Sequence, residues 1–451
     1  MPSKSGKFDH SPTLSGTSHE LDPYLPRNGN LGYRIARYDL DLTYRVSANR
    51  LTGVADLTAT SYQQLAKFTL DLASTMRVEK VTVNRKAARF SHRSGKLSIS
   101  PQSPIPAGGP MDVVIRYSGN PRPVRSDWGE VGWEELSNGA LCANQPNGAP
   151  SWFPCDDHPE AKATYLFTIT ADSPYYVLAN GVQISTRRRG ATTTWVYEQV
   201  EPMSTYLASI QVGQYEHRKL AAKPVPVSAL LPARLKTEFD ASFVNQVKMV
   251  EVFTEMFGPY PFPQYTAVVT DDPLDIPLEA QSFSTFGANH CDGTRDHERL
   301  VAHELAHQWF GNSVTLARWR DIWLHEGFAC YAEWLWSQRS GGRSADEWAR
   351  HYYEKLAASP VRVPLADPGP KQMFSDWVYK RGAITLHALR LRLGDGAFFQ
   401  LLHRWTDKYR YRSVTTEDFI ALASTYTDAS LNDLWREWLF EPQLPAFPAP
   451  H

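Results

Sequence analysis

The sequence predicts a multidomain α+β protein in which a β-rich part is followed by a mostly helical part. Two observations favour this fold class. Apolar residues recur with the period of a strand before residue 217 and with the period of a helix after it, and 451 residues are enough for two or three domains. With 42% hydrophobic residues, the chain can fill cores of that size. We divide it into residues 1–29, a flexible N-terminal arm, residues 30–217, a β-rich domain, and residues 218–451, a helical domain.

The arm and the β-rich domain are predicted from composition and from alternation. Residues before Asn30 are rich in Ser, Pro and Gly, which favours a loosely held segment. From residue 38 to residue 46 apolar and polar side chains alternate, as in a strand with one buried face. Similar runs, separated by clusters of Gly, Pro, Asn or Ser, cover residues 111–117, 164–170, 193–197 and 206–212.

The helical domain is predicted from apolar spacing and from residues that end helices. Residues 241–257 have a helical period and stop at Gly258-Pro259. Residues 295–310 have the same period, and another helix should begin near Glu326. The remaining helical segments are residues 345–356, 377–393, 398–409, 416–424 and 431–440.

The chemistry is concentrated in the pentapeptide His303-Glu304-Leu305-Ala306-His307. Because residues four apart share a helix face, both imidazoles can bind one metal ion while Glu304 lies beside an open coordination position. Glu326, nineteen positions after His307, would supply a third ligand from a neighbouring helix. Two histidines, one carboxylate and water form a catalytic zinc set, whereas a structural site is filled by protein ligands. We therefore predict one Zn²⁺ ion bound by His303, His307 and Glu326.

Charge and hydropathy narrow the choice of partners and location. The formal net charge is −1, from 47 basic and 48 acidic residues, so neither nucleic acid nor an anionic membrane is expected as a main partner. The first 16 residues lack the apolar core of a secretory signal, and no run of 18 apolar residues occurs, so we expect a soluble cytoplasmic enzyme. The four cysteines lack the C-x-x-C spacing of a structural zinc site, and we expect them to be mostly reduced and buried. If the chain is exported, a disulfide bond between Cys142 and Cys155 is the alternative.

The motif residues resemble a known family. Residues 303–312, His-Glu-Leu-Ala-His-Gln-Trp-Phe-Gly-Asn, and residues 323–329, Trp-Leu-His-Glu-Gly-Phe-Ala, are similar to the signature of the aminopeptidase N-type zinc metallopeptidases. These gluzincin aminopeptidases are relatives of leukotriene epoxide hydrolase. Residues 153–163 resemble the family's N-terminal-domain block, and residues 438–445 resemble the end of its catalytic domain. The resemblance implies a saddle-like β domain followed by a thermolysin-like zinc catalytic domain.

The family removes single residues from free peptide N-termini, and two residues here occupy the places of its amine anchors. Glu279 matches the glutamate of the family's Gly-x-Met-Glu-Asn motif, although Ile276 and Ala280 replace its Gly and Asn. Gln145, ten positions before Cys155, matches the second anchor. The resemblance therefore implies that Glu279 and Gln145 hold the α-ammonium group of the substrate.

Further roles fall to residues around the zinc ligands. Glu304 would act as the general base, and Tyr379 matches the family tyrosine that stabilises the tetrahedral intermediate by donating a hydrogen bond to the oxyanion. Glu333 lies two turns after Glu326 on the same predicted face and Asp321 lies shortly before it, so either could accept a hydrogen bond from a ligand histidine. Asp321 could instead cap the helix that carries Glu326 or the turn that precedes it.

The predicted activity is zinc-dependent hydrolysis of the N-terminal residue of peptides that have a free N-terminus, by Glu-assisted attack of zinc-bound water. Full-length family members continue into a helical C-terminal domain. Because this chain ends at His451, we expect a short form with a more open site that takes peptides of varied length. A zinc endopeptidase, an epoxide hydrolase and a non-catalytic peptide-binding module are the alternatives. Neither the preferred N-terminal residue nor the oligomeric state is predicted.

Overall fold

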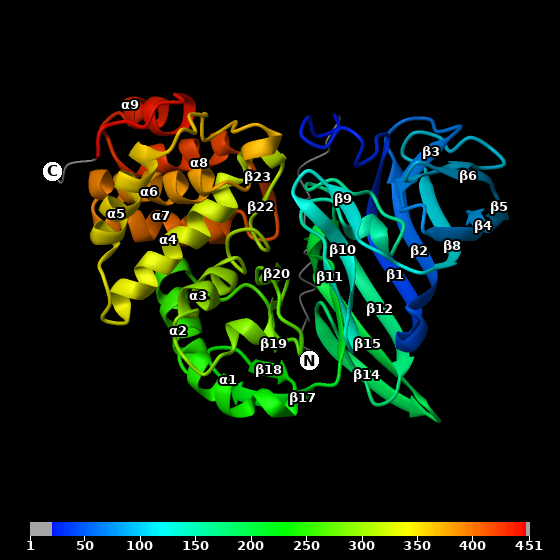
Figure 1. Cartoon of the computed structure of the whole chain (residues 1–451). Coiled ribbons are helices and arrows are strands. Elements are labelled where there is room, and N and C mark those ends of the chain that lie inside the picture. The colour runs from blue at the N-terminus through cyan, green and yellow to red at the C-terminus, as the bar shows by residue number, and fades with distance from the viewer. Residues whose placement is uncertain (1–19, 448–451) are drawn as a thin grey trace, which may run out of the picture.

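The structure, a computed structural model, describes residues 20–447 and has two parts that lie side by side (Figure 1). Strands from the first half of the chain form sheets, and helices from the second half pack around the segment that contains the zinc-ligand motif. The predicted α+β fold, with its β-rich part first, is therefore confirmed. Residues 1–19 of the predicted arm lie outside the described residues.

The main sheet is built on long amphipathic strands. Within the described residues its order is β14-β15-β12-β1-β2-β8-β4-β5. β1 pairs with β12 in parallel and with β2 in antiparallel orientation. Tyr38, Leu40 and Leu42 of β1 are buried while the residues between them are not, which explains why alternation predicted this strand. The strands are β1 Tyr33–Arg45, β2 Arg50–Ser61, β4 Met76–Val83, β5 Lys86–Ala87, β8 Pro110–Gly119, β12 Lys162–Asp172, β14 Val182–Arg189 and β15 Thr192–Ser204.

Smaller sheets complete the β-rich part, and one of them reaches the site. Over residues 20–447 their orders are β13-β16-β11-β10-β9 and β3-β7-β6. β10 and β11 pair as far as Gly132 and Ala143. The strand predicted at residues 206–212 begins only at Ile210, because residues 205–207 form a 3₁₀ turn. The strands are β3 Phe68–Asp71, β6 Arg89–Arg93, β7 Lys96–Ser100, β9 Val124–Ser126, β10 Gly129–Leu136, β11 Gly139–Ala143, β13 Tyr176–Ala179 and β16 Ile210–Gly213.

The helical part also contains a sheet that the sequence pattern did not predict. Its order in the described chain is β17-β18-β19-β21-β20. Every residue of β19 is buried, so this strand lacks the alternation by which strands are recognised. The edge strand β20 carries Glu279 and contacts the motif helix α3, Glu298–Ala306. The strands are β17 Glu216–Ala221, β18 Val227–Leu231, β19 Tyr265–Val269, β20 Leu278–Ala280 and β21 Phe283–Phe286, and a short pair joins β22 Thr315–Leu316 to β23 Ser413–Val414.

The predicted helices are present, with shifted ends. The segment predicted as one helix at residues 241–257 is divided near Phe243. The helix expected near Glu326 begins at Trp323, so Glu326 lies in its first turn. The helices are α1 Lys236–Ser242, α2 Gln246–Phe257, α3 Glu298–Ala306, α4 Trp323–Arg339, α5 Ala345–Ala358, α6 Asp376–Leu393, α7 Asp395–Lys408, α8 Thr416–Ala423 and α9 Asn432–Trp435, which continues as a π-helical turn, Arg436–Phe440.

Helices α4 and α6 cross at two glycines. A Cβ atom on Gly382 of α6 would lie 2.8 Å from the Cα of Gly327, and one on Gly327 of α4 would lie 2.9 Å from the Cα of Gly382. The two backbones are therefore in direct contact. This crossing holds the turn of α6 that bears Tyr379 beside the turn of α4 that bears Glu326.

Residues 20–29 and one buried lysine join the two parts. Asp22 accepts a hydrogen bond from the backbone N–H of Trp319 at 2.7 Å, while the N–H of Gly29 donates to Asp71 at 2.9 Å. Lys162 of β12 is 3% exposed, and its Nζ donates to the carbonyl oxygen of Ser313 at 2.9 Å. This part of the predicted arm thus contacts both halves of the molecule.

All four cysteines are free and buried, as predicted, and the Cys142–Cys155 disulfide is not formed. Burial raises the pKa of Cys142, which keeps its thiol protonated. In the described chain, 20–447, no helix combines the length and the hydrophobicity that crossing a bilayer requires.

Candidate functional site

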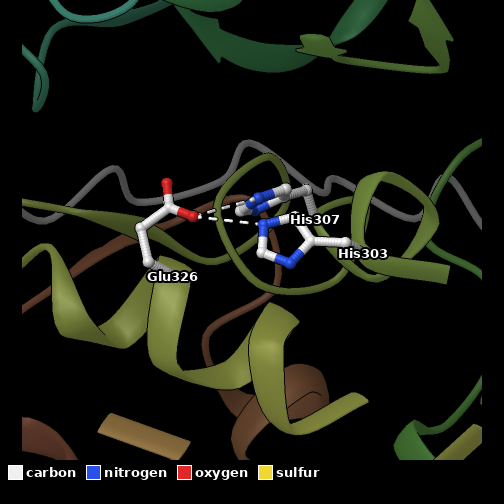
Figure 2. Close-up of side chains that lie close together, drawn as sticks. All are labelled: His303, His307 and Glu326. Atoms are coloured by element: carbon white, nitrogen blue, oxygen red, sulfur yellow. Dashed lines mark hydrogen bonds and ion pairs between the residues drawn. The ribbon is translucent and has the colours of Figure 1, made fainter. Parts of the chain in front are cut away.

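Three side chains from two neighbouring helices form a candidate metal site (Figure 2). His303 lies in α3, His307 lies at the C-terminal end of that helix, and Glu326 lies in the first turn of α4. The Oε2 atom of Glu326 is 3.3 Å from the Nε2 of His303 and 3.5 Å from the Nε2 of His307. All three residues are buried, so their ligand atoms converge inside the protein.

The second nitrogen of each imidazole is held by an oxygen, which orients both rings. His303 Nδ1 donates to Glu333 Oε1 at 2.7 Å, and His307 Nδ1 donates to the carbonyl oxygen of Phe310 at 3.0 Å. Both Nε2 atoms are then left as ligands facing Glu326. Two imidazole nitrogens and one carboxylate oxygen fit Zn²⁺ with one coordination position left for water or substrate.

Carboxylates dominate the electrostatics of this ligand set. Burial lowers the pKa of His303, but hydrogen bonds to Glu326 and Glu333 outweigh it and raise the pKa to about 10. Burial also lowers the pKa of His307, and the charges of Glu326 and Glu279 raise it to about 9. The site therefore attracts positive charge, which a divalent cation would supply in place of protons.

Glu333 and Asp321, the two residues predicted as possible partners of the ligand histidines, have different roles in the structure. Glu333 contacts His303 directly, and its other oxygen lies 3.5 Å from Arg299 Nη1. Asp321 instead accepts hydrogen bonds from the backbone N–H of Thr416 at 3.2 Å and from its hydroxyl at 2.7 Å. Asp321 is therefore not a partner of a ligand histidine in the described structure. Its carboxylate caps the N-terminus of α8, and not that of the Glu326 helix as the alternative interpretation expected.

The backbone carbonyl that holds His307 was not predicted. Phe310 is separated from His307 by one turn, and the contact is made by a main-chain atom. No residue type signals such a contact in a sequence, because every residue carries a carbonyl group.

Glu304 lies against the metal site with a free oxygen. It is 4% exposed, and its Oε2 atom has no hydrogen-bond partner within residues 20–447. Burial raises its pKa to about 7, against the opposing effect of His303 and His307. A buried carboxylate with an unpaired oxygen and a pKa near neutrality has the properties of a general base.

The two residues matched to amine anchors lie together. Gln145, from the segment after β11, donates from Nε2 to Glu279 Oε1 at 2.6 Å. Glu279 also lies with Glu304 and His307, since ligand atoms of these three residues are within 4.8 Å of one another. The structure therefore brings an acceptor pair from both domains to the edge of the metal site.

The replaced motif residues next to Glu279 have different environments. Ile276 is 67% exposed, whereas Ala280 is buried. The carbonyl oxygen of Ala280 accepts hydrogen bonds from the side chains of Gln308 and Asn312, both at 3.0 Å. Strand β20 is thus fixed to the segment that follows the metal-ligand motif, even though Ala280 has no side-chain amide.

Tyr379 lies over the ligand set. Its ring stacks on the imidazole of His303, with centroids 6.0 Å apart and planes at 10°. Burial, followed by the charges of Glu326 and Glu279, raises its pKa above the usual range. The hydroxyl therefore stays protonated and can act as a neutral hydrogen-bond donor.

One cavity of about 1130 Å³ contains the predicted site residues other than Asp321. It lies between the two parts, because Gln145 lines it from the β-rich part and α3, α4 and α6 line it from the helical part. The β9–β10 hairpin also contributes Trp128, Glu130 and Val131. These hairpin residues were not predicted as part of the site, because no sequence motif marks the hairpin.

Comparison with known proteins is consistent with this geometry. Residues 242–438 match the model of the peptidase family M1 domain, and residues 35–207 match that of the peptidase M1 N-terminal domain. A leucyl aminopeptidase of Saccharolobus solfataricus is 24% identical, over 91% of this chain and 54% of its own length. Aminopeptidase N of Lactococcus lactis is 25% identical, over 95% of this chain and 52% of its own. The chain thus spans about half the length of these relatives.

Solved structures also match. An M1 zinc metallopeptidase of Deinococcus radiodurans is 30% identical, with a TM-score of 0.87, over 95% of this chain and 99% of that one. A mutant of the Deinococcus protein has been crystallised with a Tyr-Ser-Ala substrate. Yeast LTA4 hydrolase shares the fold at 21% identity and a TM-score of 0.78, over 97% of this chain and 72% of its own.

Proposed function

The chain belongs to peptidase family M1, and on that premise we propose that it is a zinc-dependent aminopeptidase that removes the N-terminal residue from peptides. One Zn²⁺ ion is assigned to His303, His307 and Glu326. The Tyr-Ser-Ala substrate of the Deinococcus mutant supports short peptides with a free N-terminus as the substrate class.

The observation that carries this proposal is the Gln145–Glu279 pair at the edge of the metal site. A carboxylate interacts strongly with an ammonium group in a cavity that is partly shielded from water. Because Glu279 lies so close to His307 and Glu304, an ammonium held there brings the first peptide bond to the metal site. The pair therefore positions the substrate so that one residue precedes the peptide bond that is cleaved.

The chain's own side chains carry the proton transfers and the charge stabilisation. Zinc, when bound, lowers the pKa of water toward about 7 and polarises a carbonyl group. Glu304 accepts the proton of the attacking water and delivers it to the leaving amine. Tyr379 donates a hydrogen bond to the developing oxyanion. Glu333 and the carbonyl group of Phe310 keep the ligand imidazoles in the tautomer that presents Nε2.

The alternatives fit the site less well. An endopeptidase would use the same ligands and Glu304 but has no need of an amine anchor, so the Gln145–Glu279 pair argues against it. The likeness to yeast LTA4 hydrolase extends to the fold alone and does not favour epoxides as substrates. A non-catalytic binding module would not need the unpaired carboxylate of Glu304.

A matched pair of peptides tests the proposal. We expect the zinc-loaded protein to cleave a short peptide with a free N-terminus and to leave its N-acetylated twin almost untouched, because acetylation removes the ammonium charge. Chelation should abolish the activity, and zinc should restore it. Equal cleavage of the twins would indicate an endopeptidase, and no cleavage of either peptide would count against peptidase activity.

Location and organisation remain predictions from the sequence. These are the cytoplasmic location, the absence of nucleic-acid and membrane partners, and the domain limits at residues 29 and 217. Cell fractionation and limited proteolysis would test them.

A further inference from the structure

The tip of the β9–β10 hairpin reaches across the cavity to the helical part. Trp128, in the turn between these strands, donates from its indole Nε1 to the carbonyl oxygen of Pro370 at 2.9 Å. Its ring meets that of Phe374 edge-on, with centroids 5.8 Å apart and planes at 89°. We call this contact of Trp128 with Pro370 and Phe374 the clasp.

Both sides of the clasp are held in place. On the hairpin side, Ser126 Oγ accepts from the N–H of Trp128 at 3.2 Å and donates to the carbonyl oxygen of Gly129 at 2.8 Å. On the other side, the ring of Phe374 packs against Trp319 at 6.5 Å between centroids. The indole is therefore fixed in direction as well as in position.

The clasp lies at the end of the cavity where the amine anchors are. β10 pairs with β11 as far as Gly132 and Ala143, so the hairpin tip leaves the sheet at the same end as Gln145. On the opposite side, Phe374 precedes α6, the helix whose first turn bears Tyr379. The clasp thus joins the segments that hold the predicted amine anchor and the predicted oxyanion donor.

Apolar side chains from three segments line the same cavity as Glu279. Trp128 and Val131 line the cavity from the hairpin, Phe374 lines it from the loop before α6, and Leu278 lines it from β20, next to Glu279. A substrate whose ammonium is held by Gln145 and Glu279 would direct its first side chain into this end of the cavity. Both rings of the clasp, Trp128 and Phe374, belong to the lining of this cavity.

We propose that Trp128 is a specificity-determining residue that limits the size of the N-terminal side chain accepted by the enzyme. The inference rests on the proposed aminopeptidase function, since it presumes that the N-terminal residue sits at the Gln145–Glu279 pair. The indole cannot move aside without losing both the hydrogen bond to Pro370 and the ring contact with Phe374. A rigid wall of this kind excludes bulky groups more sharply than a mobile side chain would.

The test compares Trp128→Ala, Trp128→Phe and Trp195→Ala with the wild type. Trp195 is a half-buried tryptophan that packs on Tyr176 and does not line the cavity, so it is a matched control for the loss of an indole. The substrates are X-Ala dipeptides in which X runs from alanine through leucine to tryptophan. The measured quantity is the ratio of kcat/KM for X = Trp to that for X = Ala, and unfolding temperatures verify that each variant is folded.

We expect this ratio to rise at least about fivefold in Trp128→Ala, because this wall is removed, and to stay within about twofold of wild type in Trp195→Ala. Trp128→Phe, which keeps a ring but loses the N–H donor, should shift less than Trp128→Ala. An unchanged ratio in folded Trp128→Ala overturns the inference.

If the wild type cleaves none of the dipeptides, the proposed function fails instead. The affinities of free L-tryptophan and L-alanine, measured by calorimetry, then give the same comparison without turnover, and an unchanged affinity ratio in Trp128→Ala overturns the inference.

Discussion

At the scale of single residues, Glu304 combines a buried oxygen that has no partner with a place beside two metal-ligand candidates. Leaving a buried acceptor without a partner costs about 1–3 kcal/mol in typical proteins. Glu304 Oε2 is buried and has no partner among the described residues, yet it faces the cavity next to two metal-ligand candidates. Such an atom is kept available for a proton that arrives with the reaction.

Replacement of Glu304 by glutamine tests this role. We expect Glu304→Gln to lower kcat by at least about 10²–10⁴-fold, the usual contribution of a general base, since the amide cannot accept the proton. Zinc content should be unchanged, because Glu304 is not in the predicted ligand set. Steady-state kinetics on a free-amine peptide and metal analysis of the purified variant measure both effects. A variant with the kcat of the wild type would exclude Glu304 as the base.

Glu333 and Asp321 form a second contrast at this scale. Both are buried acids near the ligand set, but only Glu333 accepts a hydrogen bond from His303, while Asp321 is engaged by Thr416. We expect Glu333→Gln to weaken zinc binding by about 10–100-fold, because the imidazole loses its charged partner. Asp321→Asn should bind zinc like the wild type.

Competition with a chelator measures the zinc affinity of both variants. Thermal unfolding serves as the control that both variants are folded, since the amide oxygen in Asp321→Asn can still accept the hydrogen bonds of Thr416. Equal zinc affinities in Glu333→Gln and the wild type would contradict the assigned role of Glu333.

At the scale of elements, the crossing of α4 and α6 decides where Tyr379 lies relative to Glu326. A glycine inside a helix normally destabilises it by about 0.5–1 kcal/mol relative to alanine. At Gly382 the usual gain from alanine is opposed by backbone atoms of Gly327 only 2.8 Å from the new Cβ. The close approach therefore explains why glycine occupies both positions.

Substitution by alanine tests the crossing. We expect Gly382→Ala to destabilise the protein by about 1–3 kcal/mol, because the helices must move apart, and to lower kcat by displacing Tyr379. The control is Gly396→Ala in α7, where a Cβ would meet nothing within 4 Å. That variant should be neutral or more stable by about 0.4–1 kcal/mol. Denaturant unfolding of both variants measures the difference, and a stabilised Gly382→Ala would show that the crossing tolerates a side chain.

The elements also show what local patterns can predict. His303 and His307 share a helix face by spacing alone, and Glu304 follows His303 directly, so the grouping of these three residues could be predicted before the fold was known. The capping of α8 by Asp321 could not, because it joins residues 95 positions apart. The Trp128–Pro370 hydrogen bond joins residues 242 positions apart. Strand β19 was missed for another reason: it is buried on both faces, and its apolar run has no period that separates a strand from a helix.

At the scale of the whole molecule, the site depends on contact between the two domains. Gln145 comes from the β-rich part and Glu279 from the helical part, so their hydrogen bond exists only while the domains are aligned. Lys162 ties the domains together, since its Nζ donates to the carbonyl oxygens of Asn312 at 3.3 Å and Ser313 at 2.9 Å. The side chain of Asn312 in turn holds the carbonyl group of Ala280, next to Glu279. Domain alignment and amine binding are therefore linked through this lysine.

The buried position of Lys162 predicts that its contribution to the free energy of unfolding depends on pH. Burial lowers the pKa of Lys162 well below its usual value in the folded protein, while the unfolded chain keeps a lysine pKa of about 10.4. Between these two values the unfolded state binds more protons than the folded state, so the contribution of Lys162 to stability rises with pH. Lys162→Met removes this titration and leaves the other groups as they are. We expect the free energy of unfolding of the wild type, minus that of the variant, to increase between pH 7 and pH 9, by up to about 1.4 kcal/mol per pH unit. Urea unfolding at several pH values measures this difference, and a constant value would mean that Lys162 stays charged between the domains.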